Sequence, residues 1–390
     1  MSASSAPFRS FILGGFESSS HRRRDGRRLD LLAATGHDRF AANDYAALRR
    51  HGIATVRDGL RWHRVETAPG RYGRKSFLPL LRAAEAGGTQ VVWDLCHYGW
   101  PDDLDIWSPA FVDRFARFAA AAAAVVRDET EDPPWYCAVN EISFWAWAGA
   151  EVGRFNPCRH GEGWQLKRQL CRAAIAATRA VRDVDPRARF ITAEPLVHVC
   201  PGLGDADHRR AAEGYRLLQF EALDTLMGRR DLDLGGAPDL VDVAGVNFYP
   251  DNQWYFHGST IPMGHHAYRP FRDMLAEAHA RCGLPLLVSE TGAEGGARAA
   301  WLHYVCDEVR AAMEAGVPVE GVCLYPVLDY PAWENERVCP VGLLSVADEH
   351  GRRGACPAFA RELKRQQSIF AEDRPHRPRA DATGSSAMAG

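Results

Sequence analysis

Two glutamates lie beside apolar segments, in settings that allow acid–base chemistry. Glu141 follows Asn140 after the apolar run "WYCAV" and is flanked by aromatic residues, and Glu290 ends the run "LPLLVS". A carboxyl group among aromatic rings and a neutral amide tends toward a raised pKa and can donate a proton, whereas one held by hydrogen-bond donors stays ionised and can attack. Each glutamate alone could equally be a helix N-terminal carboxylate or one half of an ion pair.

Both glutamates fall at strand ends in a repeated strand–helix pattern. Short β-branched and aromatic runs alternate with helical stretches, the clearest being 108–128, which opens on Ser-Pro, and 296–316, which closes on Gly. The eight predicted strands are 10–16, 53–59, 90–95, 135–140, 189–194, 241–249, 284–290 and 319–325. Eight such units predict one α/β domain, a single (β/α)8 TIM barrel over residues 9–370. The polar ends, 1–8 and 371–390, are predicted to be disordered.

Strand ends matter in such a barrel, because its functional groups stand at the carboxyl ends of the strands. Glu141, after the fourth strand, and Glu290, on the seventh, would converge on one mouth from opposite arcs. Two such carboxyls suit glycosidic bond cleavage, in which one donates a proton and the other attacks or activates water. The polar residues at or just beyond strand ends are Asp58, Asp94, His97, Asn140, Glu141, Glu194, Asn247, Tyr249, Glu290, Tyr325 and Asp329.

The composition favours a neutral small-molecule substrate. The 390 residues include 47 basic and 50 acidic ones, a formal net charge of −3, which gives no reason to expect nucleic acid or an anionic membrane as partner. No stretch reaches the roughly 18 to 20 apolar residues that span a bilayer, and no leader-like pattern opens the sequence. Ten scattered cysteines without a Cys-x-x-Cys pair are typical of reduced thiols, so we expect a cytoplasmic protein.

Six segments resemble, in order and at similar spacing, the hallmark segments of glycoside hydrolase family 1, the retaining β-glycosidases of clan A. The segments are "HDRFAANDYAALRRHGIATVRDGLRWHRVET", "VVWDLCHYGWPDDL", "WYCAVNEI", "VDVAGVNFY", "LLVSETG" and "GVCLYPVLDYPAWEN". The resemblance runs from about residue 11 to residue 346. It implies a (β/α)8 barrel that hydrolyses β-glycosides with retention of configuration.

The resemblance also implies roles for individual residues. Glu141 is similar to the general acid/base of the family, and Asn140 to the residue that binds the sugar 2-hydroxyl. Glu290 looks like the nucleophile. His97 matches a histidine that contacts the 3-hydroxyl, although a single histidine could also be a core residue bonded to backbone.

The remaining matches concern the surroundings of the nucleophile. Arg57 matches the arginine that keeps the nucleophile ionised, and Tyr249 matches a tyrosine that hydrogen-bonds it, in a segment that also holds Asn247. The chemistry of these side chains agrees with those roles. A guanidinium and a phenol close to Glu290 would lower its pKa by charge attraction and hydrogen bonding.

The sugar-recognition positions depart from the family pattern. Ala332 stands where the family has an acid that grips the sugar, Tyr325 stands where it has a platform tryptophan, and His21 stands where it has a glutamine. Trp333 is the tryptophan most suited to contact a sugar ring. The arginine-rich segment 21–28 at the mouth is either a solvated loop or a contact for a phosphate, a carboxylate-bearing sugar or an acidic aglycone.

The sequence therefore predicts a retaining, exo-acting β-glycosidase with a non-standard sugar specificity. Glu290 would be the nucleophile and Glu141 the acid/base, the substrate a small carbohydrate or glycoside, and neither a cofactor nor a metal would be needed. A transglycosylase and a non-catalytic carbohydrate-binding barrel remain alternatives. A metal-dependent barrel enzyme is disfavoured because no His-x-His follows the first strand. The oligomeric state stays open.

Overall fold

The main strands form one closed ring. The computed structural model describes residues 6–335 and 337–373. The ring strands are β1 (Ile12–Gly15), β2 (Thr55–Gly59), β5 (Gln90–Asp94), β6 (Trp135–Cys137), β7 (Arg189–Ile191), β8 (Glu194–Pro195), β10 (Ala244–Asn247), β12 (Leu286–Thr291) and β13 (Val319–Leu324). They pair in parallel in the order β7, β6, β5, β2, β1, β13, β12, β10, β8. Because β8 continues β7 along the chain and pairs with β10, the ring closes, and the predicted (β/α)8 barrel is confirmed.

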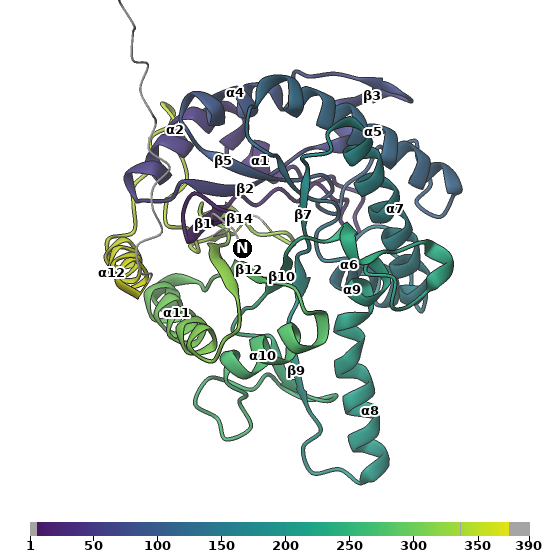
Figure 1. Cartoon of the computed structure of the whole chain (residues 1–390), viewed down its shortest axis with the longest axis vertical. Coiled ribbons are helices and arrows are strands. Elements are labelled where there is room, and N and C mark those ends of the chain that lie inside the picture. Colours follow the sequence, from purple (N-terminus) through teal and green to yellow (C-terminus); the bar gives the residue numbers. More distant parts are fainter. Residues whose placement is uncertain (1–5, 336, 374–390) are drawn as a thin grey trace, which may run out of the picture.

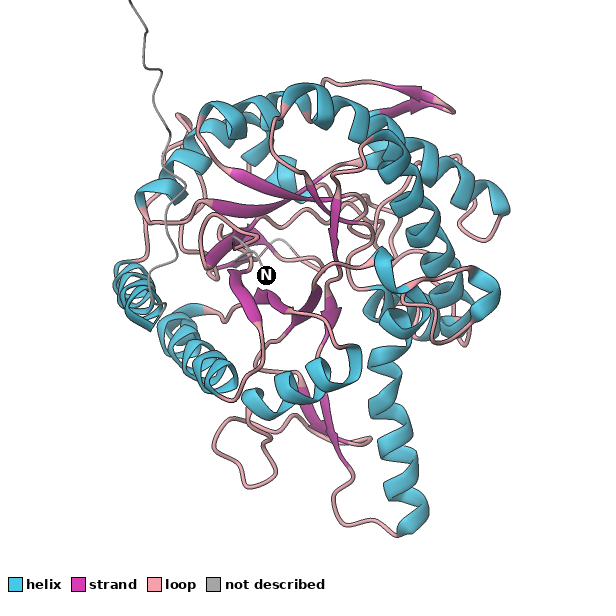
Figure 2. Cartoon of the chain, in the orientation of Figure 1, coloured by secondary structure: helices cyan, strands magenta, loops and turns pink. Residues whose placement is uncertain are grey.

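Helices surround the ring of strands (Figure 1, Figure 2). The predicted helix 108–128 is α5, which begins at Pro109 after Ser108, and the predicted helix 296–316 is α11, with Gly316 just beyond its end at a φ of +91°. The longer outer helices are α2 (His37–Arg50), α4 (Leu78–Ala86), α5 (Pro109–Glu129), α7 (Gly163–Val184), α8 (Ala206–Leu217), α9 (Glu221–Leu226), α10 (Phe271–Cys282), α11 (Arg298–Glu314) and α12 (Pro357–Asp373).

Short elements occupy the loops between strands and helices. Figure 2 shows paired strands outside the central ring, and α8 extends away from the barrel in the same view. The short helices are α1 (Leu31–Ala34), α3 (Trp62–Val65) and α6 (Ile142–Trp145), followed by a π-helical turn at Ala146–Glu151, with 3₁₀ turns at Leu218–Phe220, Leu232–Leu234, Pro238–Leu240 and Gly295–Ala297. The paired strands are β3 (Glu66–Ala68) with β4 (Arg71–Tyr72), β9 (His198–Cys200) with β11 (Gln253–Tyr255), and β14 (Tyr330–Pro331) with β15 (Val338–Cys339).

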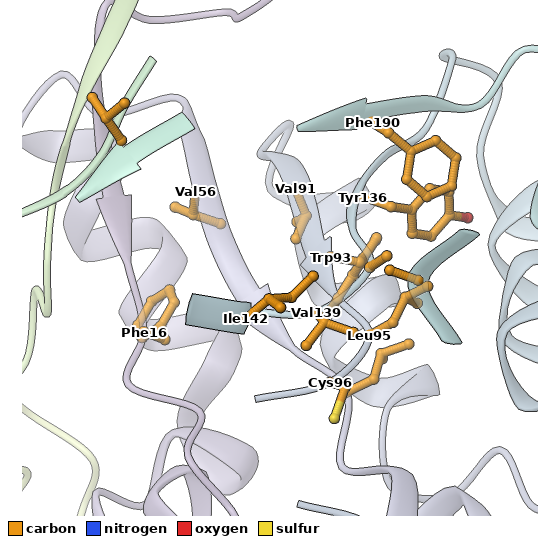
Figure 3. Close-up of a cluster of buried hydrophobic side chains, with 14 of the residues drawn as sticks. Phe16, Val56, Val91, Trp93, Leu95, Cys96, Tyr136, Val139, Ile142 and Phe190 are labelled. Atoms are coloured by element: carbon orange, nitrogen blue, oxygen red, sulfur yellow. The ribbon is translucent and has the colours of Figure 1, made fainter. Parts of the chain in front are cut away.

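Apolar side chains fill both faces of the barrel wall. The outer layer packs strands against helices, and Figure 3 shows part of it, including Val56, Val91, Trp93, Tyr136 and Phe190. Residues that alternate with these along the strands fill the barrel interior: Leu13, Val92, Trp135, Cys137, Ile191, Leu287 and Cys323 belong to that inner cluster. Burial on both faces explains why the strands read as almost continuous apolar runs.

The same alternation sorts the two charged residues of β2. Val56 and Asp58 face outward, and Asp58 accepts hydrogen bonds from Tyr45 at 2.5 Å and from His37 at 2.8 Å, both on α2. Arg57 lies between them and therefore points into the barrel. One of two adjacent charges thus anchors a helix, and the other reaches the mouth of the barrel.

The ends of the barrel differ slightly from the predicted boundaries. Phe8 is buried and packs on Trp135 with ring centroids 5.0 Å apart, because it fills the apolar interior that the short strands leave open. At the other end α12 continues to Asp373, three residues beyond the predicted limit of 370. Residues 1–5 and 374–390, which include most of the predicted disordered ends, lie outside the described residues. Among the described residues, no helix combines the length and the apolar character needed to cross a membrane.

Candidate active site

Glu290 reaches the barrel mouth because β12 carries a bulge. Leu287 faces the interior and Val288 the outer layer, so strict alternation would turn Glu290 outward. In the register with β13, Val288 pairs with Val322 and Thr291 pairs with Leu324. Between these two pairs β12 advances by three residues and β13 by two. The extra residue turns the Glu290 side chain inward. Bulges beside active sites commonly change the direction of a side chain in this way.

Hydrogen-bond donors hold the Glu290 carboxylate from two sides. Arg57 Nη1 donates to Oε1 at 3.1 Å, and the Tyr249 hydroxyl donates to Oε2 at 2.8 Å. Arg57 is fully buried and also donates to Asp94 Oδ2 at 2.7 Å and to Asn140 Oδ1 at 2.9 Å. Glu290 itself is only 4% exposed. The neighbours predicted for a nucleophilic carboxylate are therefore assembled around it.

Glu141 lies across the mouth and is held by neutral donors. The Tyr98 hydroxyl donates to Oε2 at 2.6 Å and Asn247 Nδ2 donates to Oε1 at 2.9 Å. Ser289 Oγ in turn donates to Asn247 Oδ1 at 2.6 Å, which ties this side of the site to β12. The Glu141 backbone has a φ of +45°, a left-handed conformation that costs energy for a residue with a side chain and is frequent at functional sites.

The helix-capping role considered for Glu141 belongs to another glutamate. Glu141 occupies the position before α6 but makes no side-chain cap. Glu194 instead accepts from the amides of Ile142 at 2.6 Å and Ser143 at 3.0 Å. Because Glu194 satisfies the start of the helix, the Glu141 carboxyl is left to face the mouth.

Burial raises the pKa of both carboxyl groups. Arg57 lowers the pKa of Glu290, as predicted, but burial and the nearby Glu141 charge outweigh it and raise that pKa to about 8. Burial also raises the pKa of Glu141, although Tyr98 and Asn247 act in the other direction. Two interacting buried carboxyls retain one proton near neutral pH. Since only Glu290 is bonded to a permanent cation, we place that proton on Glu141.

Asn140 and His97 connect the two halves of the site. The amide nitrogen of Asn140 donates to the Tyr98 hydroxyl at 3.0 Å and lies 3.0 Å from His97 Nε2. His97 Nδ1 lies 3.2 Å from Asp94 Oδ2 and 3.1 Å from the hydroxyl of Ser18. All these contacts are to side chains at the mouth, so His97 is not the backbone-bonded core histidine that a lone histidine suggests.

Two of the recognition positions that depart from the family pattern, Tyr325 and His21, lie in different layers. Tyr325 is in the inner layer, where its ring lies 5.4 Å from the Arg57 guanidinium and parallel to His97 at 6.1 Å. His21 and Trp333 form an outer layer, with their ring centroids 4.6 Å apart. Burial and nearby cationic groups lower the pKa of His21 to about 3, so it is neutral. Neither His21 nor Trp333 hydrogen-bonds the glutamates, and Trp333 approaches them through Tyr98, 5.6 Å away.

A cavity of about 490 Å³ lies outside this aromatic layer. Arg23, Arg24 and Arg154 are among its lining residues, but two of the three are paired with acids: Arg23 with Asp25 at 2.8 Å and Arg154 with Glu334 at 2.6 Å. Within the segment 21–28, Arg22 and Arg28 both bind Asp102. This pairing fits a solvated loop better than a site for an anion.

Three residues at the mouth escaped the sequence analysis. Tyr98 directly follows His97, and its position just beyond a strand was the available signal. Glu194 was noted as a strand-end residue without a role, and its capping bond to α6 spans more than fifty residues of sequence. Glu17 stands two residues after β1 and is buried at the mouth. Among the described residues, no three His, Cys, Asp or Glu side chains gather where they could hold a metal ion.

Comparison with solved structures shows that the chain shares its fold with β-glucosidases. No protein-family model matches the chain, and no curated protein matches it either. The chain is similar to the β-glucosidase of Thermotoga maritima in complex with glucoimidazole, with a TM-score of 0.79, 14% identity, and coverage of 92% of this chain and 98% of that one. A second structure from that organism, described as a family 1 β-glucosidase, matches with a TM-score of 0.75 and 14% identity, over 94% of this chain and 98% of that chain.

A solved structure from another organism agrees with these. The AHE enzyme of Alicyclobacillus herbarius matches with a TM-score of 0.77 and 17% identity, over 94% of this chain and 99% of that chain. At such low identity the likeness concerns the fold: the chain has the barrel of the family 1 β-glucosidases, over nearly its whole length. What the site does must be argued from its own residues.

Proposed function

We propose that the chain is a retaining, exo-acting β-glycosidase of family 1 or closely related to it. The observation that carries this proposal is that two carboxyl groups in one site have different hydrogen-bonding environments. Glu290 is bonded to a guanidinium and a phenol, whereas Glu141 is bonded to neutral donors. Unequal environments are what a carboxyl pair needs to divide into a nucleophile and a proton donor.

In the first step the Glu290 carboxylate attacks the anomeric carbon while Glu141 gives its proton to the glycosidic oxygen. The bond from carbon to the leaving oxygen breaks as the glycosyl ester forms, and the aglycone leaves as an alcohol. Arg57 and Tyr249 orient the attacking carboxylate without covering it, because each binds a different oxygen. Asn140 and His97 stand between the two carboxyls, where they can bind sugar hydroxyls.

The second step reverses the role of Glu141. Once Glu290 is an ester its negative charge is gone, and the charge that had favoured protonation of Glu141 no longer acts on it. The pKa of Glu141 therefore falls, so the group can accept a proton from water. Water then attacks the anomeric carbon, the ester bond to Glu290 breaks, and the sugar leaves with its configuration retained. A hydroxyl acceptor in place of water would give transglycosylation.

The substrate class follows from the same residues and from the neighbours. Two structures of the Thermotoga maritima enzyme hold glucoimidazole and deoxynojirimycin, which supports a sugar-sized ligand for this barrel. The altered residues Tyr325, Ala332 and His21 support a sugar preference other than the usual one of the family. The chemistry uses no cofactor, and ten unpaired cysteines are in keeping with a cytoplasmic enzyme.

The test is turnover of a panel of 4-nitrophenyl β-glycosides by the wild type and two variants. Glu290→Gln and Glu141→Gln should each lose activity by about a thousandfold or more, since each removes a group that acts in the transition state. Azide should restore turnover to Glu141→Gln with a good leaving group, giving a β-glycosyl azide. Glu349→Gln, which changes an exposed loop carboxyl, is the matched control and should behave as wild type. Undiminished activity of Glu290→Gln, or no turnover of any glycoside by the wild type, would contradict the proposal.

A further inference from the structure

Glu17 is a buried carboxylate at the mouth that the proposed mechanism does not use. It follows Phe16, whose ring stacks on His37 in the outer layer with centroids 3.6 Å apart. Alternation along the end of β1 therefore turns Glu17 to the inner side. Its Oε1 lies 3.8 Å from His97 Nε2, and the residue is only 7% exposed. Glu17 thus shares the space around His97 with the catalytic pair.

The protein satisfies only one of the two Glu17 oxygens. The amide of Ser19 donates to Oε1 at 3.0 Å, and the hydroxyl of Ser19 donates to the same atom. In the part of the chain that the structure describes, no hydrogen bond to Oε2 is found. The Oε2 atom is not fully enclosed, so a donor from a bound ligand can reach it.

A second buried polar group beside Glu17 also lacks a partner. The Tyr325 hydroxyl makes no hydrogen bond among the described residues, although the side chain is only 4% exposed. Its ring lies against β1: a Cβ at Gly15 would come within 2.2 Å of it, so only glycine allows this approach. Tyr325 and Glu17 both flank His97: the Tyr325 ring is parallel to the imidazole with centroids 6.1 Å apart, and Glu17 Oε1 lies 3.8 Å from Nε2.

We propose that the Glu17 carboxylate and the Tyr325 hydroxyl bind hydroxyl groups of the sugar beside His97, and that they select a neutral sugar over one that carries a carboxylate there. The proposal rests on the glycosidase function proposed above. An unpaired carboxylate oxygen accepts from sugar hydroxyls, and an unpaired phenol can donate to or accept from them. The chain lacks the acid and the glutamine that the family pattern has at positions 332 and 21, and Glu17, two residues after β1, supplies a carboxylate at the mouth.

Charge makes this end of the site selective. A sugar carboxylate placed beside Glu17 would bring two like charges together in a buried setting. The nearby Arg57 is already shared between Asp94 and Glu290, so it does not neutralise a third acid. A glycuronide should therefore be a far poorer substrate than the glycoside with the same ring and a neutral hydroxymethyl group.

The test compares matched substrate pairs, 4-nitrophenyl β-glucoside with β-glucuronide and β-galactoside with β-galacturonide. For the wild type, kcat/KM should favour the neutral member of whichever pair is turned over. Glu17→Gln keeps an oxygen for Ser19 but removes the charge. It should lower kcat/KM for the neutral substrate about tenfold, the usual effect of losing one hydrogen bond to a charged group, without lowering it for the uronide. The preference ratio should fall by the same factor.

Tyr325→Phe separates substrate binding from folding. The lost hydroxyl has no hydrogen-bond partner among the described residues, so the variant should unfold at the same or a slightly higher temperature, yet lose about tenfold in kcat/KM on the neutral substrate. A preference ratio unchanged within about twofold in Glu17→Gln, or full activity of Tyr325→Phe, would overturn this inference while leaving the glycosidase function intact. Absence of turnover of all four substrates by the wild type would instead remove the function and the inference together.

Discussion

Removing the hydroxyl of Tyr98 should move the pH dependence of activity upward. In the structure this hydroxyl donates to Glu141 Oε2 at 2.6 Å, a short bond to a carboxyl that must lose and regain a proton in each turnover. The donation favours the ionised form of Glu141 and so lowers its pKa relative to the same buried group without it. Tyr98→Phe therefore raises the pKa of Glu141, and the acid form persists to higher pH.

The size of the shift follows from the strength of the bond. A hydrogen bond to a charged group contributes about 1.5 to 3 kcal/mol, and about 1.4 kcal/mol corresponds to one pKa unit. The alkaline limb of kcat/KM, which reports the proton donor in the free enzyme, should rise by roughly one to two pH units. The second step needs Glu141 as a base, so kcat near neutral pH should fall for substrates whose leaving group departs easily.

The assay is a profile of kcat/KM against pH, from about pH 4 to 10, on the best aryl β-glycoside found for the wild type. Tyr136→Phe is the matched control, because Tyr136 is also a fully buried tyrosine but its hydroxyl has no hydrogen bond in the described part of the chain. Its profile should overlay that of the wild type. An unmoved or lowered alkaline limb in Tyr98→Phe would refute the assignment of Glu141 as the proton donor held by Tyr98.

Two stability predictions follow from buried networks beside the site. Glu194→Ala leaves the amides of Ile142 and Ser143 without their acceptor and should lower the free energy of unfolding by about 2 kcal/mol or more; an unchanged urea midpoint would contradict this. Burial alone would lower the pKa of His37, but Asp58 and Asp44 raise it to about 9. The ion pairs therefore stabilise the fold below about pH 6.5, and about 3 kcal/mol is lost as the pH rises through 9. His37→Gln should flatten this part of the stability curve, and parallel curves would contradict it.

The ring of strands was predictable because it is buried on both faces. Each strand reads as an apolar run of the right length, and the alternation of runs with helical stretches leaves few other folds. The ends of the barrel were less predictable. Phe8 lies in a segment poor in apolar residues, and its burial against Trp135 depends on an apolar interior that only the closed ring creates.

The convergence of Glu141 and Glu290 on one mouth was predictable from their positions at strand ends, but the local geometry of each was not. Alternation along β12 would have turned Glu290 outward, and only the bulge that the pairing with β13 reveals turns it inward. In the same way, the local sequence does not reveal the left-handed backbone of Glu141, nor that Glu194, far along the chain, accepts the first amide of α6. The lowering of the Glu290 pKa by Arg57 was predictable, but not the burial by the whole barrel, which outweighs it.

Residues that act through non-local neighbours left no signal in the sequence. Glu17 is an unremarkable acid after "GGF", and its significance comes from the Tyr325 hydroxyl that the barrel brings beside it from the other end of the chain. Gly15 allows that approach, and nothing in its local sequence marks it. In our proposal, sugar recognition therefore depends on contacts between the segment after β1 and the segment after β13.

In the proposed mechanism Glu290 forms a covalent bond to the sugar. Incubation with a 2,4-dinitrophenyl 2-deoxy-2-fluoro-β-glycoside of the preferred sugar should trap the glycosyl ester. The electron-withdrawing fluorine slows both steps, because it destabilises the positive charge that develops in both transition states. The good leaving group keeps the first step fast enough for the ester to accumulate. Mass analysis of proteolytic peptides should then find one fluoroglycosyl group on the peptide that contains Glu290, with release of one equivalent of dinitrophenol. A label on Glu141 or on another residue, or hydrolysis of ordinary aryl glycosides with inversion and no label, would contradict the account.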